Sequence, residues 1–165
     1  MDGINVIYGS STGNTETAAE LIASALNGRA ISVGKAVPAD FEVPLVVLGA
    51  STWGIGDLQD DWAAALPLLD RVDWNGRKVA LFGLGDQISF GDSFIDGIRD
   101  IYDKLAAKGV ALVGRWSTEG YSHSYSRAEV GGEFIGLALD VDNQPELTSS
   151  RVTEWCEQLR HEAGI

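Results

Sequence analysis

Residues 4–16 read Ile-Asn-Val-Ile-Tyr-Gly-Ser-Ser-Thr-Gly-Asn-Thr-Glu: an apolar run, a hydroxyl-rich turn, and the first residues of a segment with helical periodicity. A strand that leads through such a turn into a helix brings the free N–H groups of the helix start beside the hydroxyls. Together with the permissive Gly13, these donors can converge on a phosphate. The turn contains neither Lys nor Arg, so a bound phosphate would keep its charge.

The rest of the chain alternates between apolar segments and helix-period segments, which is the pattern of a parallel sheet wrapped by helices. The expected strands are 4–8, 30–33, 45–50, 78–83 and a fifth beginning at 111–113. The expected helices are about 15–26, 62–69, 93–108 and 147–162, the last capped by Thr148 or Ser149.

A polar stretch at 118–132 precedes a resumed strand pattern at 134–139. We interpret this stretch as an insertion that splits the last strand or adds a small flanking sheet. The sequence therefore predicts an α/β fold with a three-layer, doubly wound, five-stranded parallel sheet. We expect one domain over residues 1–165.

Composition narrows the class of protein. The 165 residues carry a formal net charge of −12, which would repel the phosphate backbone of a nucleic acid and attract basic protein partners. No apolar stretch approaches the ~20 residues that cross a bilayer, and we expect a cytoplasmic monomer. The single cysteine, Cys156, lies among helix-period residues and is interpreted as a structural thiol.

Three loops are expected at the edge of the sheet where ligands bind in doubly wound folds. They are residues 9–14, 51–61 and 84–92. The second loop contains Trp53 and the third contains Phe90 in a matching position. Two flat side chains beside a phosphate-binding turn suggest a flat aromatic cofactor with a phosphate tail.

With these segments the chain resembles a long-chain flavodoxin. The resemblance extends over nearly the whole chain and is carried by five segments in order, namely 10–16, 51–62, 83–87, 116–121 and 136–144. It implies the flavodoxin-like strand order 2-1-3-4-5, non-covalently bound FMN, and a protein that carries single electrons rather than an enzyme. The cofactor-binding residues that it implies are Ser10, Ser11, Thr12, Gly13, Asn14, Thr15, Thr52, Trp53, Gly54, Ile55, Gly56, Leu84, Gly85, Asp86, Phe90 and Asp142.

The family pattern also implies separate roles for these residues. The positions that match the phosphate site are Ser10, Thr12, Asn14 and Thr15, assisted by the backbone N–H groups of Ser11 and Gly13. Trp53 matches the aromatic residue on the inner flavin face, and Phe90 stands where the family usually has a tyrosine on the outer face. The segment around Gly85 and Asp86 matches the part that binds the pyrimidine edge, and Asp142 matches an acidic position near the ring.

Gly54 follows Trp53 at the point where the family's backbone is thought to flip on one-electron reduction. Glycine adopts positive φ without the roughly 1 to 2 kcal/mol that other residues incur, so it would ease such a flip. The alternative is that Gly54 only permits a tight turn.

Acidic residues on or near the loops bear on the reduction potential: Asp57, Asp60, Asp61, Asp86, Asp92 and Asp142. At an effective dielectric constant of about 20, a unit charge roughly 8 Å from an anionic reduced ring costs about 2 kcal/mol. Two or three such charges would lower a one-electron potential by roughly a few hundred millivolts before screening. The alternative is that these carboxylates are solvated and contribute little.

The partners implied are redox proteins with basic docking faces, for example a ferredoxin/flavodoxin reductase, a nitrogenase reductase or a photosystem. Two other functions stay open on the sequence: an FMN-dependent quinone reductase of the same fold, and a non-redox receiver-like signalling module. A receiver needs clustered acids after its first strand, where this chain has Gly9-Ser10-Ser11. His123 and His161 have no cysteine or acidic cluster at ligand spacing, so we expect no metal site.

Overall fold

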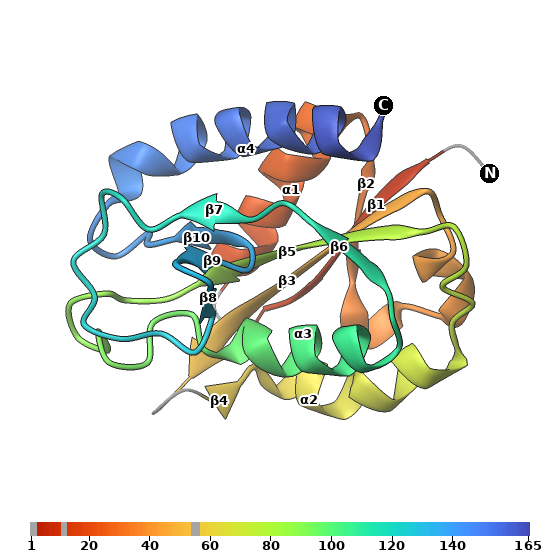
Figure 1. Ribbon diagram of the computed structural model, residues 1–165, viewed down its shortest axis with the longest axis horizontal. Coiled ribbons are helices and arrows are strands. Elements are labelled where there is room, and N and C mark those ends of the chain that lie inside the picture. The colour runs from red at the N-terminus through yellow and green to blue at the C-terminus, as the bar shows by residue number, and fades with distance from the viewer. Residues whose placement is uncertain (1–2, 11–12, 54–56) are drawn as a thin grey trace.

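A parallel sheet forms the middle layer of the computed structural model, which describes residues 3–10, 13–53 and 57–165, with Trp53 described by its backbone alone (Figure 1). Its parallel strands are β1 (Ile4–Gly9), β2 (Arg29–Ser32), β3 (Leu45–Trp53), β5 (Lys78–Leu84), β6 (Ala111–Val113) and β10 (Leu137–Leu139). The order is β2-β1-β3-β5, and both β6 and β10 pair with β5. This arrangement confirms the predicted order 2-1-3-4-5.

The central strands are buried on both faces, as their continuous apolar sequence predicts. All four residues of the run 45–48 in β3 are fully buried. The register places Val6 of β1 opposite Val47 of β3, and Gly49 of β3 opposite Phe82 of β5. Because these strands are parallel, their carboxyl ends meet at one edge of the sheet.

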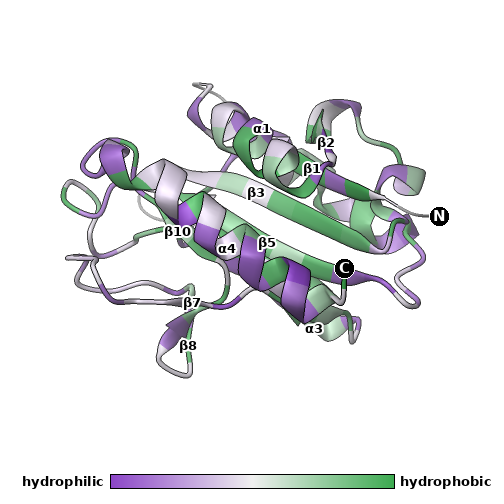
Figure 2. Cartoon of the chain, turned by 90° about the horizontal axis from the view of Figure 1, so that it is seen from above, coloured by the Kyte–Doolittle hydropathy of each residue, from purple (hydrophilic) through white to green (hydrophobic). Residues whose placement is uncertain are grey.

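Helices cover both faces of the sheet. Helices α1 (Asn14–Leu26) and α4 (Thr148–Ala163) lie on one face, and α2 (Asp60–Ala65) and α3 (Gly97–Ala107) on the other (Figures 1 and 2). Each face has its own core cluster, one with Trp155 and the other with Trp62, and both indoles are fully buried. These two tryptophans therefore pack the core.

Cys156 lies in the core cluster beneath α4. Its side chain is buried, and burial raises the pKa of its thiol to about 11. The thiol is therefore protonated at neutral pH, which agrees with a structural role.

The stretch 118–132 belongs to an insertion that has both predicted consequences. It separates β6 from β10, which pair with successive parts of β5, residues 78–80 and 82–84. It also contributes to a small antiparallel sheet of β7 (Trp116–Ser117), β9 (Glu133–Phe134) and β8 (Glu129–Val130). The predicted strand 134–139 is thus two strands, and the chain passes between them at Gly136, where a Cβ would lie 2.1 Å from the Leu81 carbonyl oxygen.

Two predictions about helix starts are wrong. The helix expected from Ser93 begins only at Gly97, because Ile95 has φ of 50°, a left-handed value that an α-helix does not contain. Neither Thr148 nor Ser149 caps α4. The 3-10 helix η4 (Pro145–Leu147) runs directly into α4, so both residues lie inside the helix, and Leu147 holds the capping position without a side-chain hydrogen bond.

The remaining elements are short. Strand β4 (Asp57–Leu58) pairs antiparallel with β3. The 3-10 helices are η1 (Val33–Lys35), η2 (Pro38–Phe41) and η3 (Leu66–Arg71), and η3 replaces the second half of the helix expected at 62–69. Within the described residues, no helix combines the length and apolar character needed to cross a membrane.

Candidate functional site

A cavity of about 300 Å³ lies at the carboxyl ends of the central strands. It receives Asn14 and Thr15 from the start of α1 and Thr52 from the end of β3. The segment after β5 contributes a further wall. The predicted site residues on the cavity wall are Asn14, Thr15, Thr52, Leu84, Gly85, Asp86, Phe90 and Asp142. The structure therefore brings together residues from all three predicted loops. The volume of the cavity falls at the lower end of the range for small-molecule sites.

The turn before α1 holds the first donors. Gly13 stands at the amino end of α1 with φ of 93°, a left-handed value that favours glycine. Its N–H donates to Ser10 Oγ at 3.0 Å, and its carbonyl accepts from the Thr17 N–H and hydroxyl. The first N–H groups of α1 have no partner one turn earlier in the helix, and the nearly buried Thr15 lies beside them. This arrangement is suited to an anion.

Several predictions fall outside the described residues: those on Ser11, Thr12, Gly54, Ile55, Gly56 and the side chain of Trp53. The stacking role of Trp53 and the backbone flip at Gly54 stay predictions. The described backbone of Trp53 pairs with Asp57 of β4, at the carboxyl end of β3.

Two serines that the sequence analysis missed contribute buried hydroxyls to the cavity wall. Ser51 Oγ and Ser93 Oγ have no hydrogen-bond partner among the described residues. Buried polar atoms rarely stay unpaired, so the cavity has polar groups that a ligand can satisfy.

The missed residues on the wall are Ser51, Ser93, Phe94, Ile95 and Val141. The helical spacing at 93–108 predicts a helix for Ser93 to Ile95, whereas these residues lie in turns before α3. No periodic signal in the sequence marks the left-handed backbone at Ile95 that ends this turn.

Gly85 allows the segment after β5 to pack closely. A Cβ at this position would lie 3.0 Å from the Phe94 ring and 3.1 Å from the backbone nitrogen of Ile95. The Gly85 N–H donates to the Leu139 carbonyl at 3.1 Å, which extends the pairing of β5 with β10 by one bond. The backbone at this part of the wall is therefore fixed from both sides.

Asp86 brings a carboxylate to the same wall. Its Oδ1 accepts hydrogen bonds from the N–H groups of Ile88 and Ser89 and from Asn143 Nδ2. Burial alone would raise the pKa of Asp86, but these hydrogen bonds together outweigh it and lower the pKa below its ordinary value. The group is therefore an anion at neutral pH.

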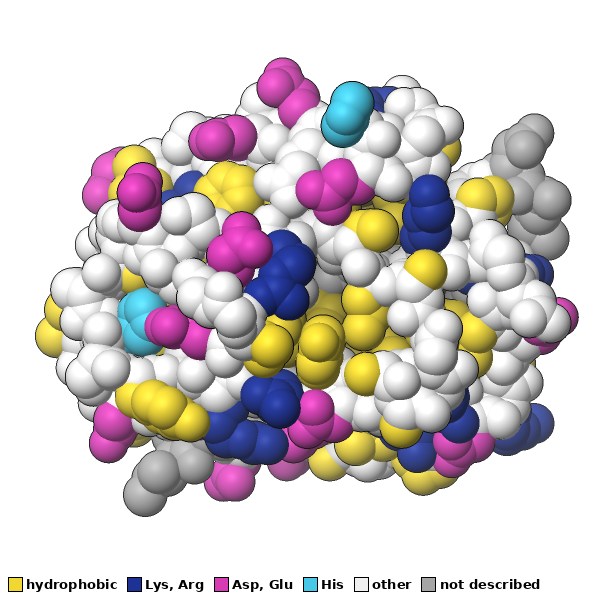
Figure 3. Space-filling model, in the orientation of Figure 1, with side chains coloured by type: hydrophobic (Ala, Val, Ile, Leu, Met, Phe, Trp, Pro, Cys, Tyr) yellow, Lys and Arg dark blue, Asp and Glu magenta, His cyan; other side chains and the backbone are white. Residues whose placement is uncertain are grey.

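The other charges near the cavity are mostly acidic. Asp142 lies on the wall, and no Lys or Arg does so among the described lining residues. Further exposed acids are Asp57 in β4, Asp60 and Asp61 at the start of α2, and Asp92 in the turns after β5. The face of the molecule in Figure 3 is less acidic than the surroundings of the cavity. Acidic and basic side chains are interspersed on it around a central group of hydrophobic side chains.

Phe90 is about half exposed at the cavity, with 49% of its surface accessible. A ring in this position can lie against a bound aromatic ligand while its other side faces water.

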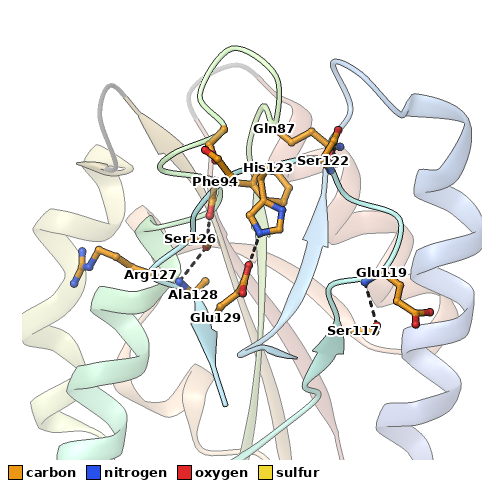
Figure 4. A network of polar contacts seen from close by, with 12 residues as sticks. Gln87, Phe94, Ser117, Glu119, Ser122, His123, Ser126, Arg127, Ala128 and Glu129 are labelled. Atoms are coloured by element: carbon orange, nitrogen blue, oxygen red, sulfur yellow. Dashed lines mark hydrogen bonds and ion pairs between the residues drawn. The ribbon is translucent and has the colours of Figure 1, made fainter. Parts of the chain in front are cut away.

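Tyr121 and His123 of the insertion pack behind the cavity. Their rings contact Phe94, which lines the wall, and Phe134. Figure 4 shows His123 beside Phe94. Burial raises the pKa of Tyr121 to about 12, and its hydroxyl donates to the Ala138 carbonyl at 2.5 Å. His123 Nε2 contacts the carboxylate of Glu129. No group of three or more His, Cys, Asp or Glu residues suited to a metal occurs in the part of the chain that the structure describes.

Comparisons with known proteins identify the family. The flavodoxin family model matches residues 6–155. A flavodoxin from Synechocystis sp. is 42% identical in an alignment that covers 97% of each chain. Flavodoxin 2 from Salmonella typhi is 41% identical over 94% of each chain. The structure of Fusobacterium nucleatum flavodoxin bound to flavin mononucleotide superposes with a TM-score of 0.91 at 34% identity, covering 98% of this chain and 99% of that one. The chain therefore belongs to the flavodoxin family.

Proposed function

We propose that this protein is a low-potential one-electron carrier that binds FMN non-covalently and passes electrons between redox enzymes. The observation that carries the proposal is the cavity itself, which joins the hydroxyl-bearing start of α1 to a wall with Phe90 and a segment of fixed backbone. The related structure from Fusobacterium nucleatum, which contains flavin mononucleotide, supports the choice of ligand.

The residues present fit FMN at both ends of the molecule. The start of α1, with Ser10, Asn14 and Thr15, would hold the phosphate without a cationic side chain. The unpaired hydroxyls of Ser51 and Ser93 offer polar partners inside the cavity. The wall around Gly85 and Phe90 would hold the ring, and Trp53 is proposed on its opposite side.

Bound FMN supplies a ring that accepts and releases electrons one at a time. The chain binds and orients that ring, excludes water from its buried part, and surrounds it with negative charge. Asp86 and Asp142 on the wall, and the phosphate without a counter-cation, would make each added electron less favourable. This arrangement accounts for the proposed low potential.

The proposal is tested by loading the purified chain with FMN and titrating it with dithionite under anaerobic conditions. We expect reduction in two resolved one-electron steps, with a transient long-wavelength absorbance after the first. Steady NADPH oxidation without an added reductase would instead favour the quinone reductase alternative. A chain that does not take up FMN contradicts the proposal.

Phe90→Tyr is expected to preserve FMN binding and to shift at least one of the two reduction potentials. Phenol is more electron-rich than phenyl and adds a hydroxyl at this half-exposed position. A difference of about 0.5 to 1 kcal/mol in stacking corresponds to roughly 20 to 40 mV for a one-electron step. Potentiometry and a fluorescence titration measure the two quantities. Unchanged affinity together with two unmoved potentials would show that the missing hydroxyl has no consequence.

The net charge of −12 suggests how partners are found. The exposed acidic residues beside the cavity would steer this protein towards basic faces of redox proteins, and salt would weaken that attraction. We further propose that the protein acts in the cytoplasm as a monomer. Electron transfer to a partner such as a ferredoxin/flavodoxin reductase should slow as ionic strength rises.

A further inference from the structure

Gln87 lies between two residues of the cavity wall but is turned away from the cavity. Asp86 and Phe90 line the cavity, and the Phe90 N–H donates to the Asp86 carbonyl at 3.0 Å, which closes a turn around Gln87. Only 2% of the surface of Gln87 is exposed. A polar side chain this deeply buried needs partners for every polar atom.

The amide of Gln87 has partners on two other segments of the chain. Its Nε2 donates to Asp140 Oδ2 and to Gln144 Oε1, each at 2.8 Å. Its Oε1 accepts from the Ser122 backbone N–H at 2.5 Å and from the Ser122 hydroxyl at 3.1 Å, and Figure 4 shows the two residues side by side. The turn is thereby tied both to the segment after β10 and to the insertion.

Asp140 continues the pairing of β5 and β10 beyond the strands. The ladder ends at Leu84 opposite Leu139, and the next bond runs from Gly85 N–H to the Leu139 carbonyl. The Gln87 N–H then donates to Asp140 Oδ2 at 3.1 Å, so a side-chain carboxylate replaces the backbone acceptor. Asp140 is 1% exposed. Its position therefore sets where the chain turns after β5.

We propose that Gln87 is a positioning residue for the cofactor: by donating to the buried carboxylate of Asp140, its amide fixes residues 84–86 and Phe90 in the arrangement that receives the flavin ring. This inference rests on the proposed binding of FMN. Gln87 itself does not line the cavity, so it acts through the backbone on either side of it.

A charge introduced at the amide of Gln87 would interact with the charged and titratable groups that surround it. Asp140 faces it directly, and Asp86 precedes it in the chain. Arg151 of α4 is connected to Gln87 only through Gln144, because both donate hydrogen bonds to Gln144 Oε1. His123 follows Ser122 and contacts Glu129. The carboxylate of Asp140 is thus the direct electrostatic neighbour.

Gln87→Glu tests the inference because it keeps the shape of the side chain and replaces the donor with a carboxyl oxygen. Above neutral pH two carboxylates would meet in a buried site, whereas near pH 5 the introduced group can hold a proton and donate to Asp140. We expect FMN to bind at least about tenfold more weakly at pH 8 than to the native chain, and the difference to shrink towards pH 5. Flavin fluorescence at both pH values gives the dissociation constants.

Gln158→Glu is the matched control. Gln158 of α4 also donates from its amide to a carboxylate, that of Glu162 at 2.9 Å, but it lies outside the cavity wall. We expect its FMN affinity to follow the native chain at both pH values. Gln87→Met, which removes the amide without adding charge, should bind FMN more weakly at both pH values and show no recovery in acid.

Melting temperatures of the FMN-free chains separate this inference from the proposed function. Gln87→Glu should melt at least about 4 °C further below the native chain at pH 8 than at pH 5. If the native chain binds no FMN, the proposed function fails, while this comparison still tests the pairing with Asp140. If the native chain binds FMN and Gln87→Glu binds it equally well at pH 8, Gln87 does not position the site.

Discussion

Gly49→Ala is expected to lower the free energy of unfolding of the FMN-free chain by about 3 kcal/mol. A Cβ at this position in β3 would lie 1.9 to 2.5 Å from three ring atoms of Phe82 on the paired strand β5. Phe82 is fully buried, so its ring can move away only by displacing packed neighbours. The Gly49 carbonyl also accepts a hydrogen bond from Trp62 Nε1 at 2.7 Å, so the strand itself is held in place. Chemical denaturation followed by circular dichroism measures the loss.

Two further variants show whether this clash is the cause. Gly34→Ala is the control, because a Cβ there would meet only Ser32 Oγ at 3.8 Å, and its stability should change by less than about 1 kcal/mol. Phe82→Leu on the Gly49→Ala background removes the opposing ring and should recover part of the loss, since the two positions are in direct contact. A Gly49→Ala chain as stable as the native one would show that the sheet can move to admit the methyl group.

Thr15→Val is expected to weaken FMN binding about tenfold to a hundredfold. The substitution keeps the shape of a nearly buried side chain on the cavity wall and removes its hydroxyl. A hydrogen bond to a charged group contributes about 1.5 to 3 kcal/mol, which corresponds to this range. A fluorescence titration with FMN gives the dissociation constant.

A titration with riboflavin, which has no phosphate, shows which part of the ligand Thr15 contacts. Its affinity should be the same for Thr15→Val and the native chain if the hydroxyl contacts the phosphate. Thr153→Val removes a hydroxyl on α4 that bonds only within its own helix, to the Ser149 carbonyl, and should leave both affinities unchanged. Equal weakening of FMN and riboflavin by Thr15→Val would place the hydroxyl near the ring instead.

Much of the fold could be predicted from local sequence. The apolar run at 45–48 predicts a strand buried on both faces, and the turn around Gly13 predicts the start of a helix, because both signals depend on neighbouring residues alone. The errors arose where tertiary contacts decided the outcome. The helical spacing of Phe94, Ile98 and Ile101 predicts a helix that includes Ser93. The left-handed backbone of Ile95 instead delays the start of the helix to Gly97.

The sequence by itself determined the alternation of strands and helices, the hydroxyl-bearing turn and the family, since periodicity, glycine positions and motif spacing can be read from neighbouring residues. Only the tertiary structure decided that Gln87 meets Asp140, 53 residues further on, and that Ser51 and Ser93 line one cavity. Such contacts depend on the register of β5 against β10 and on the path of the chain after each strand. Hydrogen bonds between distant segments form only after the sheet has brought those segments together, so no local sequence pattern predicts them.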